Sequence, residues 1–479
     1  MVFSSLPFLF VFLPAFFLCY GLAPTRWKNF LLFGGSVAFY AYGALETPLY
    51  IALLLVTIGV NWLVGLRLAP GRPRRKLWLI VGLVYDFFWL LLFKYAGFFF
   101  DNGAALWNFA TGDAVSRSWS LILPIGISFY TFQIASYLID VYWEKVEPAR
   151  SFVDLGAYLC MFPQLIAGPI VQYTQVAEQL KSRSTSLAYI DEGLRIFVLG
   201  LGSKVLLANR IGALWSDAQA AGFDSLSTPA AWMAAAAFSF QLYFDFYGYS
   251  LMAVGLGRIM GFDLPENFRD PYQSVSMTEF WRRWHMTLGS WFREYVYIPL
   301  GGNRVSKAKI IRNLLIVWLL TGFWHGAEWN FIIWGLYFGV ILILEKFFIL
   351  KFFDKLPKVL GSIISHTYTL FLTVIGFVIF NETSLAGVGK TLSAMFGGEG
   401  LAFSNSETIY YLRSYIAVII VAAILSTPLL KKLGEYIRSK KIGNSIVSVL
   451  QPVCYIAILL ICTASLINGS FNPFIYFRF

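Results

Sequence analysis

Charged residues are scarce in this sequence. Only 13% of its 479 residues are Asp, Glu, Lys or Arg, which is about half of the share found in soluble domains. Hydrophobic residues account for 58%. Water cannot solvate such a composition, so we exclude a soluble globular protein. A bilayer core about 30 Å thick needs about 20 apolar residues per helix. The sequence offers such runs repeatedly, and an all-α polytopic membrane protein is predicted.

Signals for several kinds of chemistry are absent as well. The four cysteines, Cys19, Cys160, Cys454 and Cys462, lie in apolar runs and have no C-x-x-C spacing, which excludes redox and cysteine–zinc sites. No H-x-x-x-H pair, G-x-S-x-G motif or G-x-x-x-x-G-K-[ST] phosphate loop occurs. We therefore expect no metal ion, no bound cofactor and no serine or cysteine nucleophile.

Basic residues concentrate in a few loops, which the positive-inside rule places in the cytoplasm. These loops are 26–28, 67–76, 282–312, 346–358 and 431–441, and the stretches 45–47, 95–118, 210–228 and 382–410 are expected outside. The net charge of +11 follows from these loops, so it gives no reason to expect nucleic-acid binding. Ten spans fit this pattern, with both termini outside: 6–22, 30–44, 48–66, 77–93, 119–139, 193–209, 229–259, 361–380, 411–430 and 444–468.

The first predicted span, 6–22, has the position of a signal peptide, which is also an N-terminal apolar run. No basic residue precedes the run 6–22, and no small-residue cleavage site follows it. We expect it to be a retained span.

Two apolar stretches do not fit as single crossings. The stretch 152–171 contains Pro163, Gly168 and Pro169, which interrupt a helix. Basic residues flank 310–344 on both sides, and TGFWHGAEWN breaks it in the middle. Each limb of 310–344 would hold about 14 residues, or about 21 Å of helix, which is short of a full bilayer. We predict re-entrant segments at both places, with two tilted full spans as the alternative for 310–344.

The chain has only three histidines, and ionisable side chains at membrane depth are functional by default. His325 lies between Gly322 and Gly326 beside Trp324, so a ligand could approach closely and an apolar wall would keep the imidazole neutral. We predict that His325 is a general base, the role for which histidine is best suited near neutral pH. Glu328 would orient it only if helix persists through the glycine. A structural histidine is the alternative.

His285 lies in the run EFWRRWH at 279–285. If this run continues as a helix, Trp281, Trp284, His285 and Leu288 share one face. Arg282 and Arg283 then point elsewhere, towards headgroups or an acidic ligand. The residues alone are equally compatible with a functional His285 and with an aromatic helix at the membrane interface. His366, at the start of a span, is expected to be interfacial. The polar stretch around 262–310 is predicted to form amphipathic helices.

Intramembrane acids form another group. Asp245 is expected to face a cavity and to pair with Arg or His, because exposure to lipid would be costly. Asp86 and Asp140 are interpreted in the same way, as members of structural pairs.

Several motifs together resemble the membrane-bound O-acyltransferase (MBOAT) superfamily. They are FPQLIAGPI at 162–170, FQLYFDFYG at 240–248, EFWRRWH at 279–285, YIPLGGNR at 297–304 and TGFWHG at 321–326. Within the superfamily the chain is similar to the membrane subunits of alginate O-acetyltransferase, as is its ending FNPFIYFRF at 471–479. The likeness covers essentially the whole chain. We therefore predict one domain over 1–479, with a core at about 115–350.

The resemblance implies a ring of about 10–11 helices around a central channel in a bacterial inner membrane. It implies that His325 is the catalytic histidine and His285 a second functional position. The acyl donor, acetyl-CoA as co-substrate, would arrive from the cytoplasm, where Arg282, Arg283, Arg293 and Arg304 could attract its phosphates. Trp324, Trp284 and Asp245 are further candidates for substrate binding. A periplasmic SGNH-type partner protein, or the exopolysaccharide itself, would receive the acetyl group.

Three other functions remain open from the sequence. A transporter of acyl groups predicts inverted repeats and paired broken helices in both halves, and no matching halves are found. An MBOAT protein with another cargo, such as D-alanyl groups, would need a docking surface for a carrier protein. A non-catalytic scaffold would keep acetylation normal when both His325 and His285 are replaced.

Overall fold

The computed structural model describes all residues except 1, 167, 399, 401, 470–473 and 476–479. Every regular element in the described part of the chain is a helix, as the sequence predicts. The chain forms two compact units. The first comprises residues 1–194 and 253–265, and the second comprises 195–252 and 266–479. Of the motif at 471–479, only Phe474 and Ile475 belong to the described residues.

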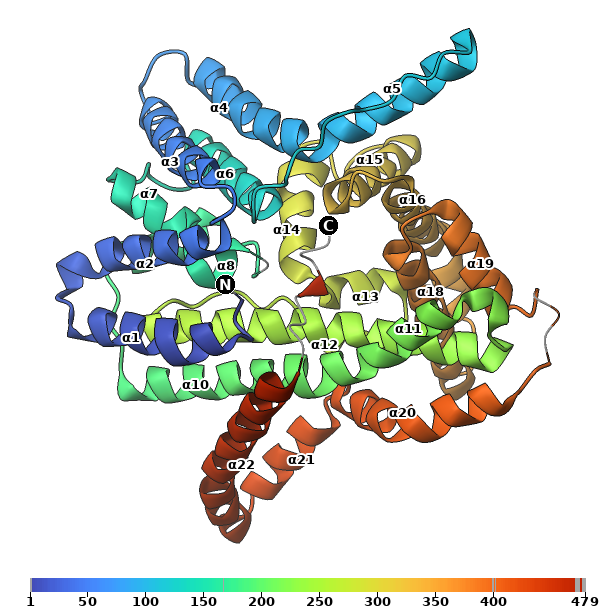
Figure 1. The fold of residues 1–479 in the computed structure, drawn as a ribbon. Helices are drawn as coiled ribbons and strands as arrows, with labels where there is room; N and C mark the ends of the chain where they lie inside the picture. The colour runs from blue at the N-terminus through green and yellow to red at the C-terminus, as the bar shows by residue number, and fades with distance from the viewer. Residues whose placement is uncertain (1, 167, 399, 401, 470–473, 476–479) are drawn as a thin grey trace. The chain divides into compact units, whose positions relative to one another are not determined.

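Helices of the first unit are short or medium in length (Figure 1). They are α1 (Leu13–Leu22), α2 (Lys28–Gly43), α3 (Leu49–Arg67), α4 (Arg75–Leu90), α5 (Ala96–Thr111), α6 (Ile127–Tyr142), α7 (Phe152–Leu159), α8 (Phe162–Leu165) and α9 (Tyr173–Lys181). Two further helices, α10 (Leu187–Gly202) and α12 (Thr228–Met260), contribute residues to both units.

The second unit holds the remaining helices. They are α11 (Asn209–Ala221), α13 (Met277–Arg283), α14 (Met286–Phe292), α15 (Lys307–His325), α16 (Trp329–Leu344), α17 (Leu350–Phe353), α18 (Lys358–Asn381), α19 (Leu385–Met395), α20 (Ser406–Leu425), α21 (Leu429–Arg438) and α22 (Lys441–Asn468).

Seven helical segments among the described residues are long and apolar enough to cross a membrane. Six of them overlap spans predicted from the sequence: Leu49–Arg67, Arg75–Thr111, Leu187–Ala221, Lys358–Asn381, Ser406–Leu425 and Lys441–Asn468. The seventh, Trp329–Phe353, lies where the sequence suggests the second limb of an interrupted pair. The protein is therefore a multi-pass membrane protein.

Two expectations about loops and spans are wrong in detail. The stretch 95–118 is not an external loop throughout, because α5 (Ala96–Thr111) continues the helix that starts with α4. The span expected at 119–139 begins only at Ile127, where α6 starts. Both errors have one cause: aromatic and small residues near these boundaries are compatible with helix and loop alike, so local composition does not fix the ends.

The first unit contains the interrupted stretch 152–171, which is broken as predicted. α7 ends at Leu159, α8 covers Phe162–Leu165, and the residues described beyond α8 are not helical until α9. The break comes at Cys160 and Met161, ahead of the predicted Pro and Gly positions, and both residues are fully buried. The Phe162 ring anchors the turn among the rings of Phe3, Phe8, Phe12, Phe16 and Phe39. A buried aromatic cluster thus offsets the cost of irregular backbone.

In the second unit, α15 and α16 lie side by side as a helical hairpin (Figure 1). Two glycines allow this close approach: a Cβ on Gly322 would collide with Phe331 O, and one on Gly335 would collide with Trp318 O. Small residues let helices in membranes pack closely. The hairpin turns at 326–328, as predicted.

The limb lengths of this hairpin differ from the expectation. α15 has 19 residues and the second limb, Trp329–Phe353, has 25. Each is long enough to approach or exceed the thickness of a bilayer core, so the argument from short limbs is wrong. The depth of the turn in the membrane stays a prediction.

Candidate functional site

His325 is the last residue of α15 and is buried, with only 3% of its surface exposed. Three aromatic rings surround its imidazole. The ring centroids of Trp324, Trp334 and Phe380 lie 4.8, 4.9 and 5.2 Å from that of His325, each in an edge-to-face arrangement. The apolar wall expected from Trp324 therefore exists, and two further rings complete it.

His285 does not lie on a continuous helix, and this corrects the prediction of a shared face. α13 ends at Arg283, Trp284 is extended, and α14 starts at Met286. His285 itself adopts the left-handed conformation, with φ 45° and ψ 51°. A left-handed non-glycine residue costs about 1–3 kcal/mol and persists only where its surroundings enforce it. Such outliers concentrate at functional sites.

Asn267 enforces this conformation. Its backbone oxygen accepts a hydrogen bond from Met286 N at 2.9 Å. Its side-chain Oδ1 accepts from Thr287 N at 3.3 Å and from Thr287 Oγ1 at 2.9 Å. Its Nδ2 donates to Ser250 Oγ at 3.2 Å. The Asn267 side chain thus connects the break in the helix to α12, which carries Ser250.

The same contacts determine the tautomer of His285. His285 Nδ1 lies 3.1 Å from Asn267 Oδ1. Because a backbone N–H can only donate, the Asn267 atom that faces Thr287 N must be the oxygen, and an amide oxygen can only accept. His285 Nδ1 therefore carries the proton and donates it to Asn267 Oδ1. In the neutral ring Nε2 then holds the lone pair.

His285 is held in its neutral form. It lies outside the seven candidate spans, and burial lowers its pKa from 6.5 to about 3. Its ring packs edge-to-face on Phe246, with 4.7 Å between centroids. A neutral imidazole with a protonated Nδ1 can accept a hydrogen bond at Nε2 but cannot donate one there.

The two histidines meet at one aromatic ring. The Trp324 ring centroid lies 6.0 Å from that of His285 and 4.8 Å from that of His325. Both imidazoles are buried, and all three residues belong to the second unit. Residues that are 40 positions apart in the sequence thus pack against one buried indole ring.

Trp284 packs into an aromatic cluster with Phe268, Phe280 and Phe377, at centroid distances of 5.0, 5.5 and 4.9 Å. Phe268 in turn contacts Phe246, the ring on which His285 packs. A role of Trp284 in substrate binding stays a prediction. Its position explains part of the local fold: the large ring anchors the extended residue that precedes His285.

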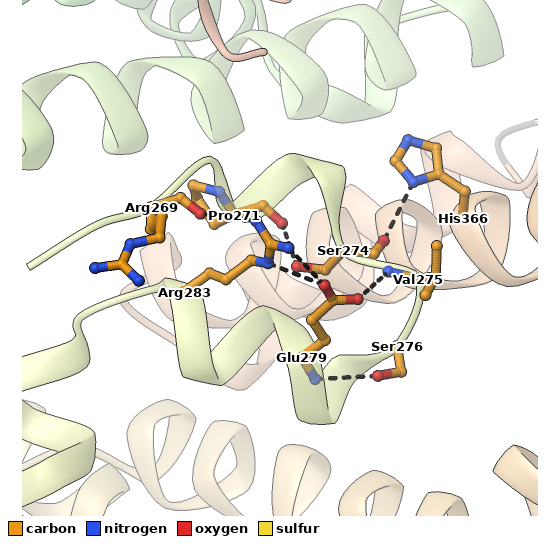
Figure 2. Close-up of polar contacts among 8 residues, drawn as sticks. All are labelled: Arg269, Pro271, Ser274, Val275, Ser276, Glu279, Arg283 and His366. Carbon is orange, nitrogen blue, oxygen red and sulfur yellow. Dashed lines mark hydrogen bonds and ion pairs between the residues drawn. The ribbon is translucent and has the colours of Figure 1, made fainter. Parts of the chain in front are cut away.

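Arg283 stabilises the loop that leads into α13 (Figure 2). Its Nε and Nη2 donate to Glu279 Oε1 at 3.0 and 2.8 Å, and its Nη1 donates to Arg269 O at 3.3 Å. Glu279 Oε2 in turn accepts from Val275 N at 2.9 Å. This set of contacts gives Arg283 a structural role. Arg282, Arg293 and Arg304 are exposed and remain available to an anionic substrate.

His366 belongs to the same loop network and not to the pair of histidines. Its Nδ1 lies 3.2 Å from Ser274 O (Figure 2), and since a carbonyl only accepts, Nδ1 carries the proton. His366 sits on α18, two turns after the helix start. Glu328 cannot be the i+3 helical partner of His325 because α15 ends at His325.

Asp245 forms a buried ion pair with a lysine, where the sequence led us to expect Arg or His. Lys204 Nζ lies 2.5 Å from Asp245 Oδ1, and both side chains are almost completely buried. Asp245 Oδ2 also accepts from Ile475 N at 2.8 Å. In the first unit, Asp140 pairs with Lys145 at 3.4 Å and Asp86 accepts from Asn61 at 2.6 Å. These acids have structural partners, as interpreted from the sequence.

Sequence reasoning missed four residues of the site: Asn267, Phe246, Trp334 and Phe380. The stretch around Asn267 was expected to be amphipathic helix, yet 263–268 has no regular structure. The signal that could have indicated Asn267 is its position in the short polar segment between Pro265 and Pro271, where a polar side chain without helix tends to bond to neighbouring backbone.

Comparison with known proteins identifies the family of the chain. The model of MBOAT, the membrane-bound O-acyltransferase family, matches residues 148–356. A probable alginate O-acetylase AlgI of Azotobacter vinelandii is 35% identical over 510 residues, which cover all of both chains. That of Pseudomonas aeruginosa is 41% identical over 400 residues, or 83% of this chain and 75% of the other. The peptidoglycan O-acetyltransferase of Helicobacter pylori is 37% identical over 445 residues, or 85% and 81%. This multi-pass membrane protein is thus an O-acyltransferase and belongs to the membrane-bound O-acyltransferase family.

Proposed function

We propose that this chain takes acetyl groups from acetyl-CoA at the cytoplasmic face of a bacterial inner membrane and passes them on for O-acetylation of an exopolysaccharide such as alginate. One observation carries the proposal: two buried histidines converge on Trp324. Relatives named as alginate O-acetylases and a peptidoglycan O-acetyltransferase support the acetyl group and a polysaccharide acceptor.

His325 acts as the general base in this proposal. A nitrogen of its imidazole removes the proton from the acceptor hydroxyl while that oxygen attacks the thioester carbonyl carbon. The carbon–sulfur bond then breaks, and the departing thiolate of CoA takes up the proton from the imidazolium. The products are the acetyl ester and free CoA thiol. Base assistance of this kind typically contributes a factor of about 10²–10⁴.

His285 holds a substrate rather than stabilising an oxyanion. Stabilising a developing negative charge requires a hydrogen-bond donor, whereas Nε2 of the neutral ring is an acceptor once Asn267 holds the proton on Nδ1. His285 Nε2 therefore accepts a hydrogen bond from an amide N–H of the donor, because His325 takes the single proton of the reacting hydroxyl.

The proposal also gives the exposed arginines a role in attracting the donor and gives the transfer a direction across the membrane. Arg282, Arg293 and Arg304 attract the phosphates of CoA on the side of the basic loops, with both termini on the opposite side. A periplasmic SGNH-type protein receives the acetyl group and passes it to the polymer. The proposal of a partner is supported by the length of the segments expected outside the membrane, of which 95–118 and 382–410 are the longest; neither has the length of a separate polymer-binding domain.

Transfer of labelled acetyl groups tests the proposal. The purified full-length chain is reconstituted into proteoliposomes, [¹⁴C]acetyl-CoA is supplied on the side of the basic loops, and CoA thiol release and label on a hydroxyl acceptor are measured. We expect His325→Ala to lower the rate about 10²- to 10⁴-fold. His366→Ala serves as the matched control, because this histidine bonds to Ser274 O in the loop network, and it should retain activity.

Three outcomes would contradict the proposal. Wild-type rates in a His325→Ala, His285→Ala double variant would indicate a scaffold. Accumulation of intact acetyl-CoA on the far side without ester formation would indicate a transporter. Activity only with a D-alanyl carrier protein would change the cargo and the donor.

A further inference from the structure

The helix α21 (Leu429–Arg438) has no buried residue. It joins two candidate spans, Ser406–Leu425 and Lys441–Asn468, so both of its ends lie at one surface of the membrane. Its 10 residues correspond to about 15 Å of helix, which is too short to cross a bilayer. α21 contacts α22 and lies beside it (Figure 1). The bilayer surface is therefore its immediate environment.

The residues of α21 divide into two faces. Leu429, Leu433 and Ile437 follow one another at intervals of four, with Leu430 beside them, and all four side chains are exposed. Lys431, Lys432, Glu435 and Arg438 fall on the opposite side of the helix by the same spacing. An amphipathic helix with a basic polar face is the pattern of helices that lie in a membrane interface.

Basic charge continues into the turn after α21. Lys440 and Lys441 are exposed, and Lys440 Nζ lies 4.7 Å from the centre of the Tyr436 ring. Arg438 Nη2 donates to Gln451 of α22 at 2.5 Å, which fixes the turn against α22. Glu435 is the only acidic residue from 429 to 441. A second copy of the chain would bring like charges together here, whereas an anionic surface would be attracted.

A groove of about 510 Å³ lies at this turn. Two lysines line it together with apolar side chains: Tyr436, Ile437, Lys440, Lys441, Ile442 and Gly443. Ammonium groups beside exposed apolar carbon suit a ligand with a phosphate at one end and hydrocarbon at the other. The groove therefore has the chemistry of a phospholipid site at the level of the headgroups.

We propose that α21 and this groove bind an anionic phospholipid. Lys440 and Lys441 hold its phosphate, and the apolar face of α21 packs against its acyl chains. Lys431 and Lys432 contribute attraction to neighbouring anionic headgroups. The proposal concerns a surface outside the histidine site, so it holds or fails independently of the acetyl transfer proposed above.

Native mass spectrometry of the full-length chain tests this site. The protein in detergent is titrated with phosphatidylglycerol or with phosphatidylcholine of the same acyl chains, and apparent Kd values are compared. We expect tighter binding of phosphatidylglycerol. We expect Lys440→Gln/Lys441→Gln to weaken it about five-fold for each lysine removed, as each basic residue near an anionic lipid contributes a factor of about this size.

Three matched variants sharpen the test, each checked for unchanged thermal stability. Lys307→Gln/Lys309→Gln removes two exposed lysines at the start of α15 and should leave the Kd unchanged. Glu435→Gln removes the acid and should not weaken binding. Leu430→Ser/Leu433→Ser should weaken both lipids alike. Equal wild-type affinity for the two lipids would overturn the proposal. So would wild-type affinity in Lys440→Gln/Lys441→Gln, or an equal loss in the α15 variant.

Discussion

Asn267 Oδ1 lies 3.1 Å from His285 Nδ1 and fixes the proton of the imidazole on that nitrogen. The amide orientation is independent of the histidine, since Thr287 N donates to the same oxygen. One side chain therefore sets the backbone, the ring orientation and the tautomer of His285. At metal-bound histidines, partners that orient the ring in this way typically contribute a factor of about 10–100 to activity.

We predict that Asn267→Ala lowers acetyl transfer about 10- to 100-fold while the protein stays folded, because His285 loses its orientation. Asn267→Asp keeps the acceptor but adds a negative charge, which raises the pKa of His285. The rate of that variant should fall as the pH decreases towards the raised pKa, because a protonated ring cannot accept a hydrogen bond.

Rates of acetyl transfer by Asn267→Ala and Asn267→Asp, measured between pH 5 and 8, test the lost orientation and the raised pKa. Ser250→Ala is the control, since Ser250 accepts from the amide nitrogen of Asn267 and not from the group that faces His285, and this substitution should lower the rate much less. A wild-type rate and pH profile in Asn267→Ala would show that Asn267 has no positioning role.

The lowered pKa of His285 predicts a pH dependence of stability. The folded chain holds this pKa at about 3, whereas an unfolded histidine titrates near 6.5. Between these values the unfolded state binds more protons, so the free energy of unfolding contributed by His285 is complete above about pH 6.5 and declines as the pH falls towards 3. The unfolding temperature in detergent should therefore fall more steeply between pH 7.5 and 4.5 for the wild type than for His285→Asn. Parallel curves would contradict the burial of a neutral ring.

The Lys204–Asp245 ion pair predicts a loss of stability when one partner is removed. Asp245→Asn leaves a buried ammonium without its carboxylate, which typically costs about 3–5 kcal/mol of unfolding free energy. Lys204→Met/Asp245→Leu should recover most of this loss, because similar apolar volume replaces both charges. Chemical denaturation in detergent measures both. Normal stability with a raised KM for the acyl donor in Asp245→Asn would instead make Asp245 the substrate-binding residue that the sequence suggested.

The contact between α15 and α16 predicts a cost for Gly322→Ala. The added methyl group would collide with Phe331 O, and overpacking of this kind costs about 1–3 kcal/mol. Because His325 follows in the next turn of α15, the rate of acetyl transfer should fall as well. Gly389→Ala in α19 is the control: its Cβ meets nothing within 4 Å, so it should be neutral or stabilising by up to about 1 kcal/mol. Equal effects of the two substitutions would contradict the close packing.

Much of the fold follows from local composition. Six of the seven candidate spans were predicted because long apolar runs between basic loops can be satisfied only by helices in lipid. The breaks in 152–171 and 310–344 were predicted because Pro and Gly act on their own backbone. Limb lengths and helix ends were less accurate, since they depend on packing partners that the sequence does not identify.

The sequence by itself determined that lipid is the solvent, that helices are the elements, and that His325 and His285 are the side chains to examine. It could not determine that His285 breaks a helix, because the bonds from Asn267, a residue 18 positions away, help to hold His285 in the left-handed conformation. Nor could it place Trp324 against both imidazoles, since that depends on how α15 packs against the segment 267–285. The position of the proton on His285 and the approach of both histidines to Trp324 depend on contacts between residues that are far apart in the sequence. Only the tertiary structure decides them.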